Sequence, residues 1–243
     1  MGGEPLRIYV GWDAKVPESY DVCVYSLQRH TSSPLDIRPL QQASLREEGL
    51  YWRPSDPLAS TEFTYSRFLV PALAGYSGWA LYCDCDFLWR ADVAELFQHC
   101  SDPDVAVYCV QHDHRPTENL KMDGKVQTSY PRKNWSSLMM FNCGHPSSRS
   151  LTPEVVNTQT GAYLHRLAWA QDQEIGGLKC SSGFAAARPA GNSGCCSPYY
   201  CLELPDFGQN DYIGVFAPVR LFFAAAFFLG FARGASPHRP SRS

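Results

Sequence analysis

The stretch Trp79–Trp89, WALYCDCDFLW, decides the fold that this sequence predicts. Its first half is apolar on both faces, as in a strand that is buried inside a parallel sheet. If that strand continues through Asp84 and Asp86, its period of two points both carboxylates to one side and turns Cys83 and Cys85 toward the core. The stretch therefore predicts a buried strand that carries an acidic pair at its carboxyl end.

This acidic pair has the chemistry of a cation site. Two carboxylates in close sequence offer the oxygen ligands that Mg²⁺ or Mn²⁺ prefers, and a cation bound there would bridge to phosphates. The pattern Asp-x-Asp is short, and a solvated turn with two ordinary carboxylates is the alternative. The apolar strand in front of the pair favours the metal site.

The composition is that of a globular domain. The chain has 243 residues, 44% of them hydrophobic and 19% charged, and its formal net charge of -3 comes without a basic block. Nucleic acid is therefore not expected as a partner. The ten cysteines form no metal-binding or disulfide pattern, which favours free, buried thiols in a reducing compartment. With no apolar leader at the start, the sequence favours a cytoplasmic protein.

The first 40 residues predict the opening of a parallel sheet. A strand at 6–10 is closed by the segment Gly11–Asp13, a helix follows at 17–30, and a second strand lies at 35–40. Pro39 cannot donate a ladder hydrogen bond, so the second strand is expected at an edge or a strand end.

The next predicted helix, Ser60–Leu73, carries an arginine on a partly apolar face. Ser60 is expected as the N-cap, and Pro71 should end or bend the helix. Arg67 shares its face with Phe63 and Val70. It can form a structural salt bridge, or it can bind a diphosphate or sugar and pair with an aspartate of the site.

Alternation of strands and helices continues to residue 178. The sequence predicts a helix at 92–97 capped by Asp92, strands at 105–110 and 136–142, a helix start at Thr152, and a helix at 162–170. His112 and His114 are interpreted as part of a solvated loop, and residues 118–132 as a long exposed loop. Polar residues before Gly176 mark either a helix terminus or a tip that faces a substrate.

Five ordered segments together resemble a glycosyltransferase of the GT-A fold, most similar to the family 8 type that uses nucleotide-diphosphate sugars. The segments are IYVGWD, TYSRFLVPAL, LYCDCD, SSLMMFN and DQE, and the resemblance covers roughly residues 7–178. It implies an α/β, Rossmann-like, mixed and mostly parallel sheet flanked by helices, with an incomplete C-terminal part.

The resemblance also implies roles for individual residues. Asp84 and Asp86 would hold Mn²⁺ or Mg²⁺ on the donor diphosphate, beside Cys85, and Arg67 would reach the donor sugar. The other contacts implied are Gly11, Trp12 and Asp13 with the base, Ser136 and Ser137 with the sugar, and Asp172 and Gln173 with the donor sugar and the acceptor. Ser136 and Ser137 stand where the family usually has an Asn-Ala-Gly-like sequence.

The implied activity is transfer of a hexose from a nucleotide-diphosphate sugar, with a UDP-sugar as the expected donor, to a carbohydrate, lipid or protein acceptor. The cation neutralises the charge that grows on the leaving diphosphate. The resemblance alone implies retention of anomeric configuration, with Gln173 supporting the sugar or the acceptor rather than acting as a nucleophile.

The resemblance stops after Leu178. Residues 1–178 are expected to form the transferase-like domain, 179–212 a linker, and 213–243 an apolar segment with a basic tail. Residues 213–232 could associate with a membrane, pack on the domain as a helix, or be foreign to the fold. The last reading leaves a truncated domain that binds nucleotide sugar or a protein partner without catalysis.

Overall fold

A computed structural model describes residues 4–56, 59–113, 132–178, 200–202 and 213–215 of the chain. Six strands form one sheet in the order β2-β1-β3-β5-β4-β6. Strand β5 runs antiparallel to both of its neighbours, whereas the other neighbouring pairs are parallel. The strands are β1 (Leu6–Gly11), β2 (Leu35–Leu40), β3 (Trp79–Cys83), β4 (Val107–Asp113), β5 (Arg132–Asn142) and β6 (Ile175–Leu178).

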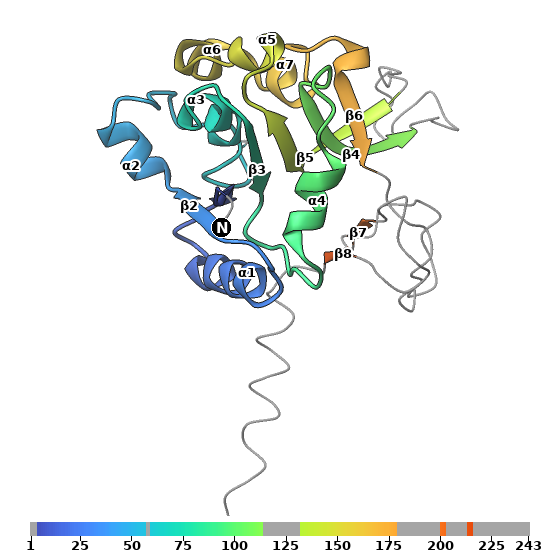
Figure 1. Cartoon of the computed structure of the whole chain (residues 1–243). Helices are drawn as coiled ribbons and strands as arrows, with labels where there is room; N and C mark the ends of the chain where they lie inside the picture. The colour runs from blue at the N-terminus through green and yellow to red at the C-terminus, as the bar shows by residue number, and fades with distance from the viewer. Residues whose placement is uncertain (1–3, 57–58, 114–131, 179–199, 203–212, 216–243) are drawn as a thin grey trace, which may run out of the picture.

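Short helices flank this sheet. Figure 1 shows α5, α6 and α7 grouped at one end of the sheet and α1 at the opposite end. The α-helices are α1 (Pro17–Arg29), α2 (Gln42–Glu47), α3 (Val70–Leu73), α4 (Val93–His99), α5 (Pro146–Arg149), α6 (Pro153–Thr158) and α7 (Gly161–His165). Two 3₁₀-helices, η1 (Ser66–Leu69) and η2 (Asp172–Glu174), complete the domain. The mixed, mostly parallel sheet flanked by helices that the sequence predicted is confirmed.

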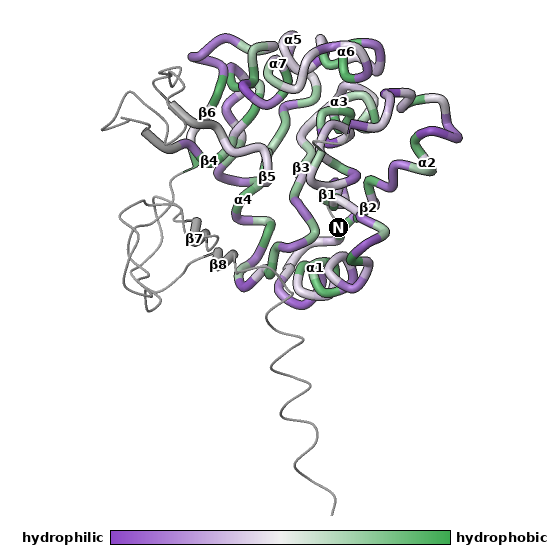
Figure 2. Tube along the Cα trace, turned by 180° about the vertical axis from the view of Figure 1, so that it is seen from behind, coloured by the Kyte–Doolittle hydropathy of each residue, from purple (hydrophilic) through white to green (hydrophobic). Residues whose placement is uncertain are grey.

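The core lies on the central strands. Residues 80–83 of β3 and 138–141 of β5 are at most 1% exposed, and Cys23 and Leu27 of α1 pack in the same buried cluster. Figure 2 shows hydrophobic residues recurring in α1, α3 and α4 as well as in the strands. Each large apolar side chain buried in this way stabilises the fold by about 1.5–3 kcal/mol. This rigid centre carries the carboxyl end of β3.

Several local predictions are confirmed. The helix at 17–30 forms as α1, and the strand that contains Pro39 lies at the edge of the sheet as β2. The Asp92 carboxylate caps α4 by accepting a hydrogen bond from the backbone N–H of Ala94 at 2.9 Å. The Thr152 hydroxyl caps α6 in the same way. These positions follow local rules of side-chain capping, which is why the sequence alone locates them.

The predicted helix at 60–73 is wrong in its first half. Helical structure begins only at Ser66, with η1 leading into α3. The hydroxyl of Thr64 donates to the backbone carbonyl of Thr61 at 2.8 Å and accepts from the Thr61 N–H at 3.2 Å. Such local bonds offer the backbone an alternative to helix, so residues 60–65 form turns and Ser60 is not an N-cap.

The predicted helix at 162–170 is also too long, because α7 ends at His165. Leu167 has a φ of 54°, in the left-handed region that interrupts an α-helix. Its side chain is 1% exposed, and Trp169 two residues later is 6% exposed. Burial of these two side chains outweighs the backbone cost of about 1–2 kcal/mol at Leu167.

The cysteine prediction holds for the part of the chain that the structure describes. Six cysteines there are free and buried: Cys23, Cys83, Cys85, Cys100, Cys109 and Cys143. The Sγ atoms of Cys23 and Cys83 lie 3.9 Å apart and share a hydrogen bond, not a disulfide. These thiols act as core packing groups.

Other predictions fall on residues outside the described ranges. They concern His114, most of the loop at 118–132, the linker at 179–212 and the apolar segment at 213–232. The loop predicted at His112 is wrong, because His112 lies in β4 opposite Lys133 of β5. From the later segments the structure describes a pair of antiparallel strands, β7 (Tyr200–Leu202) and β8 (Ile213–Val215). Among the helices in the described ranges, none has the length and apolar character needed to cross a membrane.

Candidate active site

Three segments meet at the carboxyl ends of β1 and β3. Val10 and Cys83 are paired in the parallel ladder, so Gly11 at the end of β1 and Asp84 just after β3 are neighbours. The backbone N–H of Asp84 donates to the carbonyl of Ser137 at 2.9 Å, which ties the start of the acidic turn to β5. Ligands of open α/β sheets bind beyond such strand ends.

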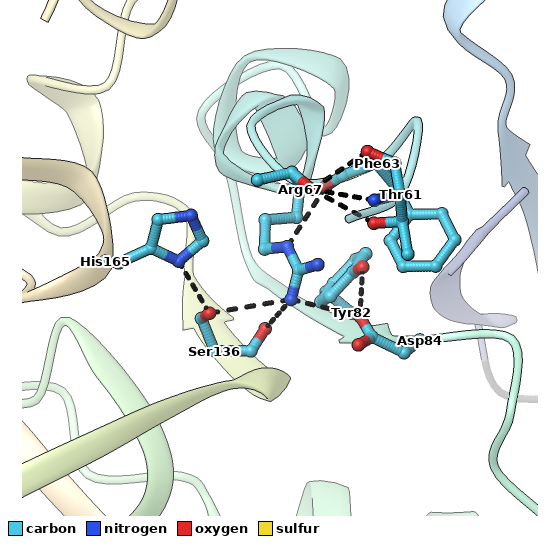
Figure 3. A network of polar contacts seen from close by, with 8 residues as sticks. Thr61, Phe63, Arg67, Tyr82, Asp84, Ser136 and His165 are labelled. Atoms are coloured by element: carbon cyan, nitrogen blue, oxygen red, sulfur yellow. Dashed lines mark hydrogen bonds and ion pairs between the residues drawn. The ribbon is translucent and has the colours of Figure 1, made fainter. Parts of the chain in front are cut away.

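Arg67 joins these segments from the other side (Figure 3). Its Nη1 lies 3.0 Å from Oδ1 of Asp84 and donates to the carbonyl of Ser136 at 2.7 Å, and its Nε donates to the carbonyl of Phe63 at 3.0 Å. The guanidinium also lies 5.1 Å from the centre of the Tyr82 ring. Arg67 is only 6% exposed, so it is a fixed, buried cation beside the acidic turn. Of the alternatives left open by the sequence, the structure shows the pairing with Asp84.

The acidic pair does not continue the strand. Strand β3 ends at Cys83, and Asp84 to Asp86 follow in a turn, so the predicted strand alternation through the pair is wrong. The main chain of Asp84 is drawn to Ser137, and its side chain is turned to Arg67 and accepts a hydrogen bond from the Tyr82 hydroxyl. Asp86 is exposed. The two carboxylates still influence each other electrostatically.

Burial sets the electrostatics of Asp84. Desolvation, reinforced by the charge of Asp86, raises the pKa of Asp84 to about 6, although Arg67 and the Tyr82 hydroxyl act in the opposite direction. Its side chain is 19% exposed. Desolvation by nearby protein raises the pKa of Asp86 too, although this residue is exposed at the surface. A carboxyl pair with raised pKa values is an environment that a bound cation would stabilise.

Cys85 lies between these aspartates but faces away from them. It is 3% exposed, as the sequence predicted for a side chain turned to the core. Burial raises the pKa of its thiol to about 12. A buried neutral thiol is neither a nucleophile nor a ligand for a hard cation, so the backbone is the only part of Cys85 that could face a donor.

Residues 11–13, which were predicted to contact the base, are held by a close ring contact and by hydrogen bonds of Asp13. A Cβ on Gly11 would lie 2.7 Å from Cγ of Phe63, so glycine is needed for the close approach of this ring. Buried Asp13 accepts hydrogen bonds from the backbone N–H groups of Lys15 at 2.9 Å and Glu62 at 3.4 Å. Trp12, which lies between Gly11 and Asp13, is half-buried. Asp13 therefore fixes the loop beside the site.

Ser136 brings in a histidine that the sequence did not single out. The Ser136 Oγ lies 2.9 Å from Nδ1 of His165, at the end of α7. The ring of His165 meets the Phe68 ring edge-on at a centroid distance of 5.2 Å. Burial, together with the positive charges of Arg67 and Arg53, lowers the pKa of His165 to about 4. No pattern near His165 indicated this contact, because it joins elements 29 residues apart.

The structure does not bring Asp172 and Gln173 to this cluster. They belong to η2, at the start of β6, and β6 is parallel to β4 with Ile175 opposite Val107. This is the amino edge of the sheet, whereas Asp84 follows the carboxyl end of β3 (Figure 1). Both side chains are exposed, and Gln173 donates to the side chain of Gln171 at 2.6 Å. A donor-sugar contact from these two residues is not part of the observed geometry.

The donor set of the acidic turn fits a hard divalent cation. Asp84 and Asp86 supply carboxylate oxygens in an environment that raises both pKa values. Mg²⁺-type sites commonly use one or two carboxylates together with substrate phosphates and water. Within the described residues no group of three or more His, Cys, Asp or Glu side chains is placed to hold a metal ion. Among the residues that the structure describes, this pair would be the part of such a site that the protein supplies.

The sheet order, with its single antiparallel strand and an acidic turn at the carboxyl edge, is a Rossmann-like α/β fold of the GT-A type. The chain belongs to the family of Protein CDI of Arabidopsis thaliana. The two are 53% identical over 175 residues, which are 72% of this chain and 67% of that protein. No protein-family model matches the chain.

Solved structures with similar folds are glycosyltransferases, at low similarity. The bifunctional glycosyltransferase WbbM aligns with a TM-score of 0.45 and 15% identity, over 72% of this chain and 38% of that one. Mouse xyloside xylosyltransferase 1 aligns with a TM-score of 0.47 and 12% identity, over 72% of this chain and 86% of that one. The chain thus spans well under half of WbbM, and at these scores the likeness carries no conclusion about activity.

Proposed function

We propose that this protein is a metal-dependent glycosyltransferase that moves a hexose from a nucleotide-diphosphate sugar, a UDP-sugar by resemblance to family 8, to a carbohydrate, lipid or protein acceptor. The observation that carries the proposal is the contact of buried Arg67 with the raised-pKa carboxyl of Asp84 at the carboxyl edge of the sheet. A buried cation next to desolvated carboxylates suits a diphosphate with its counter-ion better than it suits a purely structural role.

Each residue of the cluster has a defined part in this proposal. Asp84 and Asp86 would hold Mg²⁺ or Mn²⁺, which supplies charge neutralisation for the leaving diphosphate. Arg67 is held by the carbonyls of Phe63 and Ser136, so its charge is oriented before a donor arrives. The loop fixed by Asp13 forms the neighbouring wall for the base. Retention of configuration is proposed on the resemblance alone.

Thermal unfolding with UDP, with Mn²⁺ and with both tests the proposal. A ligand at a hundred times its dissociation constant stabilises by about 2.7 kcal/mol, or roughly 5–10 °C for a domain of this size. We expect a shift that requires both ligands, and its loss in Asp84→Asn and in Asp86→Asn. Asp36→Asn is the matched control, because Asp36 pairs with Arg38 on edge strand β2. An undiminished shift in Asp84→Asn would refute the assignment.

A second candidate is a nucleotide-binding domain without transferase activity. The separation of Asp172 and Gln173 from the acidic turn favours it, since the resemblance placed both residues on the donor sugar. This candidate requires the joint UDP and Mn²⁺ shift without release of UDP from UDP-glucose or UDP-galactose in the presence of mixed acceptors. Steady, metal-dependent release of UDP by the purified protein would exclude it.

A further inference from the structure

The carboxylate of Asp84 is held through one of its two oxygens. Nη1 of Arg67 lies 3.0 Å from Oδ1, and the hydroxyl of Tyr82 donates a hydrogen bond to the same oxygen (Figure 3). Among the residues that the structure describes, none donates a hydrogen bond to Oδ2. The side chain of Asp84 is 19% exposed, so a ligand from solution can reach it. Oδ2 is therefore the oxygen that remains for a cation.

Tyr82 is firmly placed for this contact. It lies in β3 between two strands, opposite Tyr9 of β1 and Met139 of β5, and it is 0% exposed. Its hydroxyl and the Arg67 guanidinium reach Oδ1 from two different elements, which fixes the rotation of the carboxyl group. A cation bound by both oxygens of Asp84 would have to share Oδ1 with the phenol proton and with the guanidinium charge. Coulomb repulsion and the weakening of both contacts disfavour that arrangement.

We infer that Tyr82 is a positioning residue that limits Asp84 to binding a cation through Oδ2 alone, and that it thereby favours Mg²⁺ or Mn²⁺ over Ca²⁺. Ca²⁺ takes more oxygen ligands than Mg²⁺ and binds carboxylates through one or both oxygens, whereas Mg²⁺ keeps an octahedral shell that water helps to fill. Restriction to one oxygen therefore removes a ligand that Ca²⁺ can use and Mg²⁺ does not need. The inference rests on the proposed function and adds ion selectivity to its metal site.

Competition between cations tests this role. Electron paramagnetic resonance of free Mn²⁺ gives the Kd of Mn²⁺ with saturating UDP at pH 7.5, and addition of Mg²⁺ or Ca²⁺ gives their Kd values by displacement. We expect Tyr82→Phe to weaken the binding of Mn²⁺ by about 10- to 100-fold, as is usual when a group that orients a metal ligand is lost. Mg²⁺ should weaken by a similar factor. Ca²⁺ should weaken less, because the freed carboxylate can offer it both oxygens, so the preference for Mn²⁺ over Ca²⁺ falls.

Tyr9→Phe is the matched control. Tyr9 lies opposite Tyr82 in the ladder, is 2% exposed, and has no hydrogen-bond partner for its hydroxyl among the described residues. We expect this variant to bind each cation as the wild type does. An unchanged preference for Mn²⁺ over Ca²⁺ in Tyr82→Phe, with or without weaker binding, would show that Tyr82 only packs the core and would overturn the inference.

The wild-type protein supplies a second test that does not depend on the folding of a variant. It should bind Mn²⁺ more tightly than Ca²⁺ in the presence of UDP. Equal affinity for the two cations would overturn the inference, and the proposed function would still stand on the joint stabilisation by UDP and Mn²⁺. If the wild-type protein binds no divalent cation together with UDP, the inference and the proposed function fall together.

Discussion

An acidic side chain lies at the amino ends of the strands and another at their carboxyl ends, and the two have opposite environments. At the amino edge, Glu174 accepts hydrogen bonds from the Ser147 hydroxyl at 2.7 Å and the Gln171 backbone N–H at 2.9 Å, and these bonds lower its pKa. At the carboxyl edge, Asp84 is desolvated and its pKa is raised to about 6. Glu174 is satisfied by a local capping box, whereas Asp84 is paired with Arg67 of another element and accepts a hydrogen bond from the Tyr82 hydroxyl.

This difference separates structural from functional carboxylates. A capping box forms between residues three apart and stabilises a turn without further partners. A desolvated carboxyl with a raised pKa costs free energy in the folded state, and such costs collect at sites that bind a charged partner. Asp84 is therefore the candidate for a functional carboxylate, rather than the acidic residues of the segment 172–174.

Removal of the cation that compensates Asp84 should have the largest effect on stability. We expect Arg67→Met to lower the free energy of unfolding by about 3–5 kcal/mol, because it leaves a buried carboxylate unpaired. Urea denaturation at pH 7.5 measures the loss. Arg38→Met is the control: it breaks an exposed pair with Asp36, which should cost at most about 1 kcal/mol. Asp84→Asn added to Arg67→Met should recover part of the stability. If it recovers none, Arg67 does not stabilise the fold by compensating the charge of Asp84.

The pH dependence of stability should separate Asp84 from His165. The folded pKa of Asp84, about 6, lies above its ordinary value of 3.8, so its contribution to stability is full below pH 3.8 and is lost as the pH rises to 6. The folded pKa of His165, about 4, lies below its ordinary value of 6.5, so its contribution is full above pH 6.5 and is lost as the pH falls to 4. In the wild type these two trends oppose each other.

Variants should reveal the two trends. On going from pH 6.5 to pH 4, Asp84→Asn should lose about 2 kcal/mol relative to wild type, and His165→Asn should gain about 2.5 kcal/mol. Urea denaturation of each variant beside the wild type cancels the contributions of other groups. Parallel profiles of wild type and Asp84→Asn between pH 4 and 6.5 would show that Asp84 is not desolvated.

The smallest effect is expected at the amino edge. Glu174→Gln removes the charge from the capping box but leaves one amide oxygen as an acceptor, so we expect a loss of about 1 kcal/mol at pH 7. Because the folded pKa of Glu174 is lowered below its ordinary value of 4.5, this loss should vanish as the pH falls below 4.5. Thermal unfolding measures it, and UDP with Mn²⁺ should shift the variant as far as wild type. A ligand shift that disappears in this variant would move Glu174 into the donor site.

Sequence reasoning located what depends on neighbours along the chain. The apolar run of β3, the N-caps at Asp92 and Thr152, and the edge position of the strand with Pro39 follow from burial and local hydrogen bonding. It failed where a local preference met a tertiary one. Leu167 leaves the predicted helix because its side chain is buried in the core.

For the candidate site too, the sequence identified residues, and the structure showed how they are arranged. Asp84, Asp86 and Arg67 were identified from residue type and element position, but not the geometry that joins them. The strand was expected to carry the acidic pair, whereas the pair lies in a turn after Cys83. His165 could not be found, because its role exists only through a contact with Ser136 on another element.

By itself, the sequence determined an α/β sheet with an acidic pair after a buried strand and an arginine before it, because hydrophobic period and residue chemistry are local properties. Only the tertiary structure decided which polar residues meet. The antiparallel course of β5 brings Ser136 beside Arg67 and Asp84, and the parallel course of β6 places Asp172 and Gln173 at the other edge of the sheet. Strand direction is set by pairing between distant segments, so no stretch of sequence contains it.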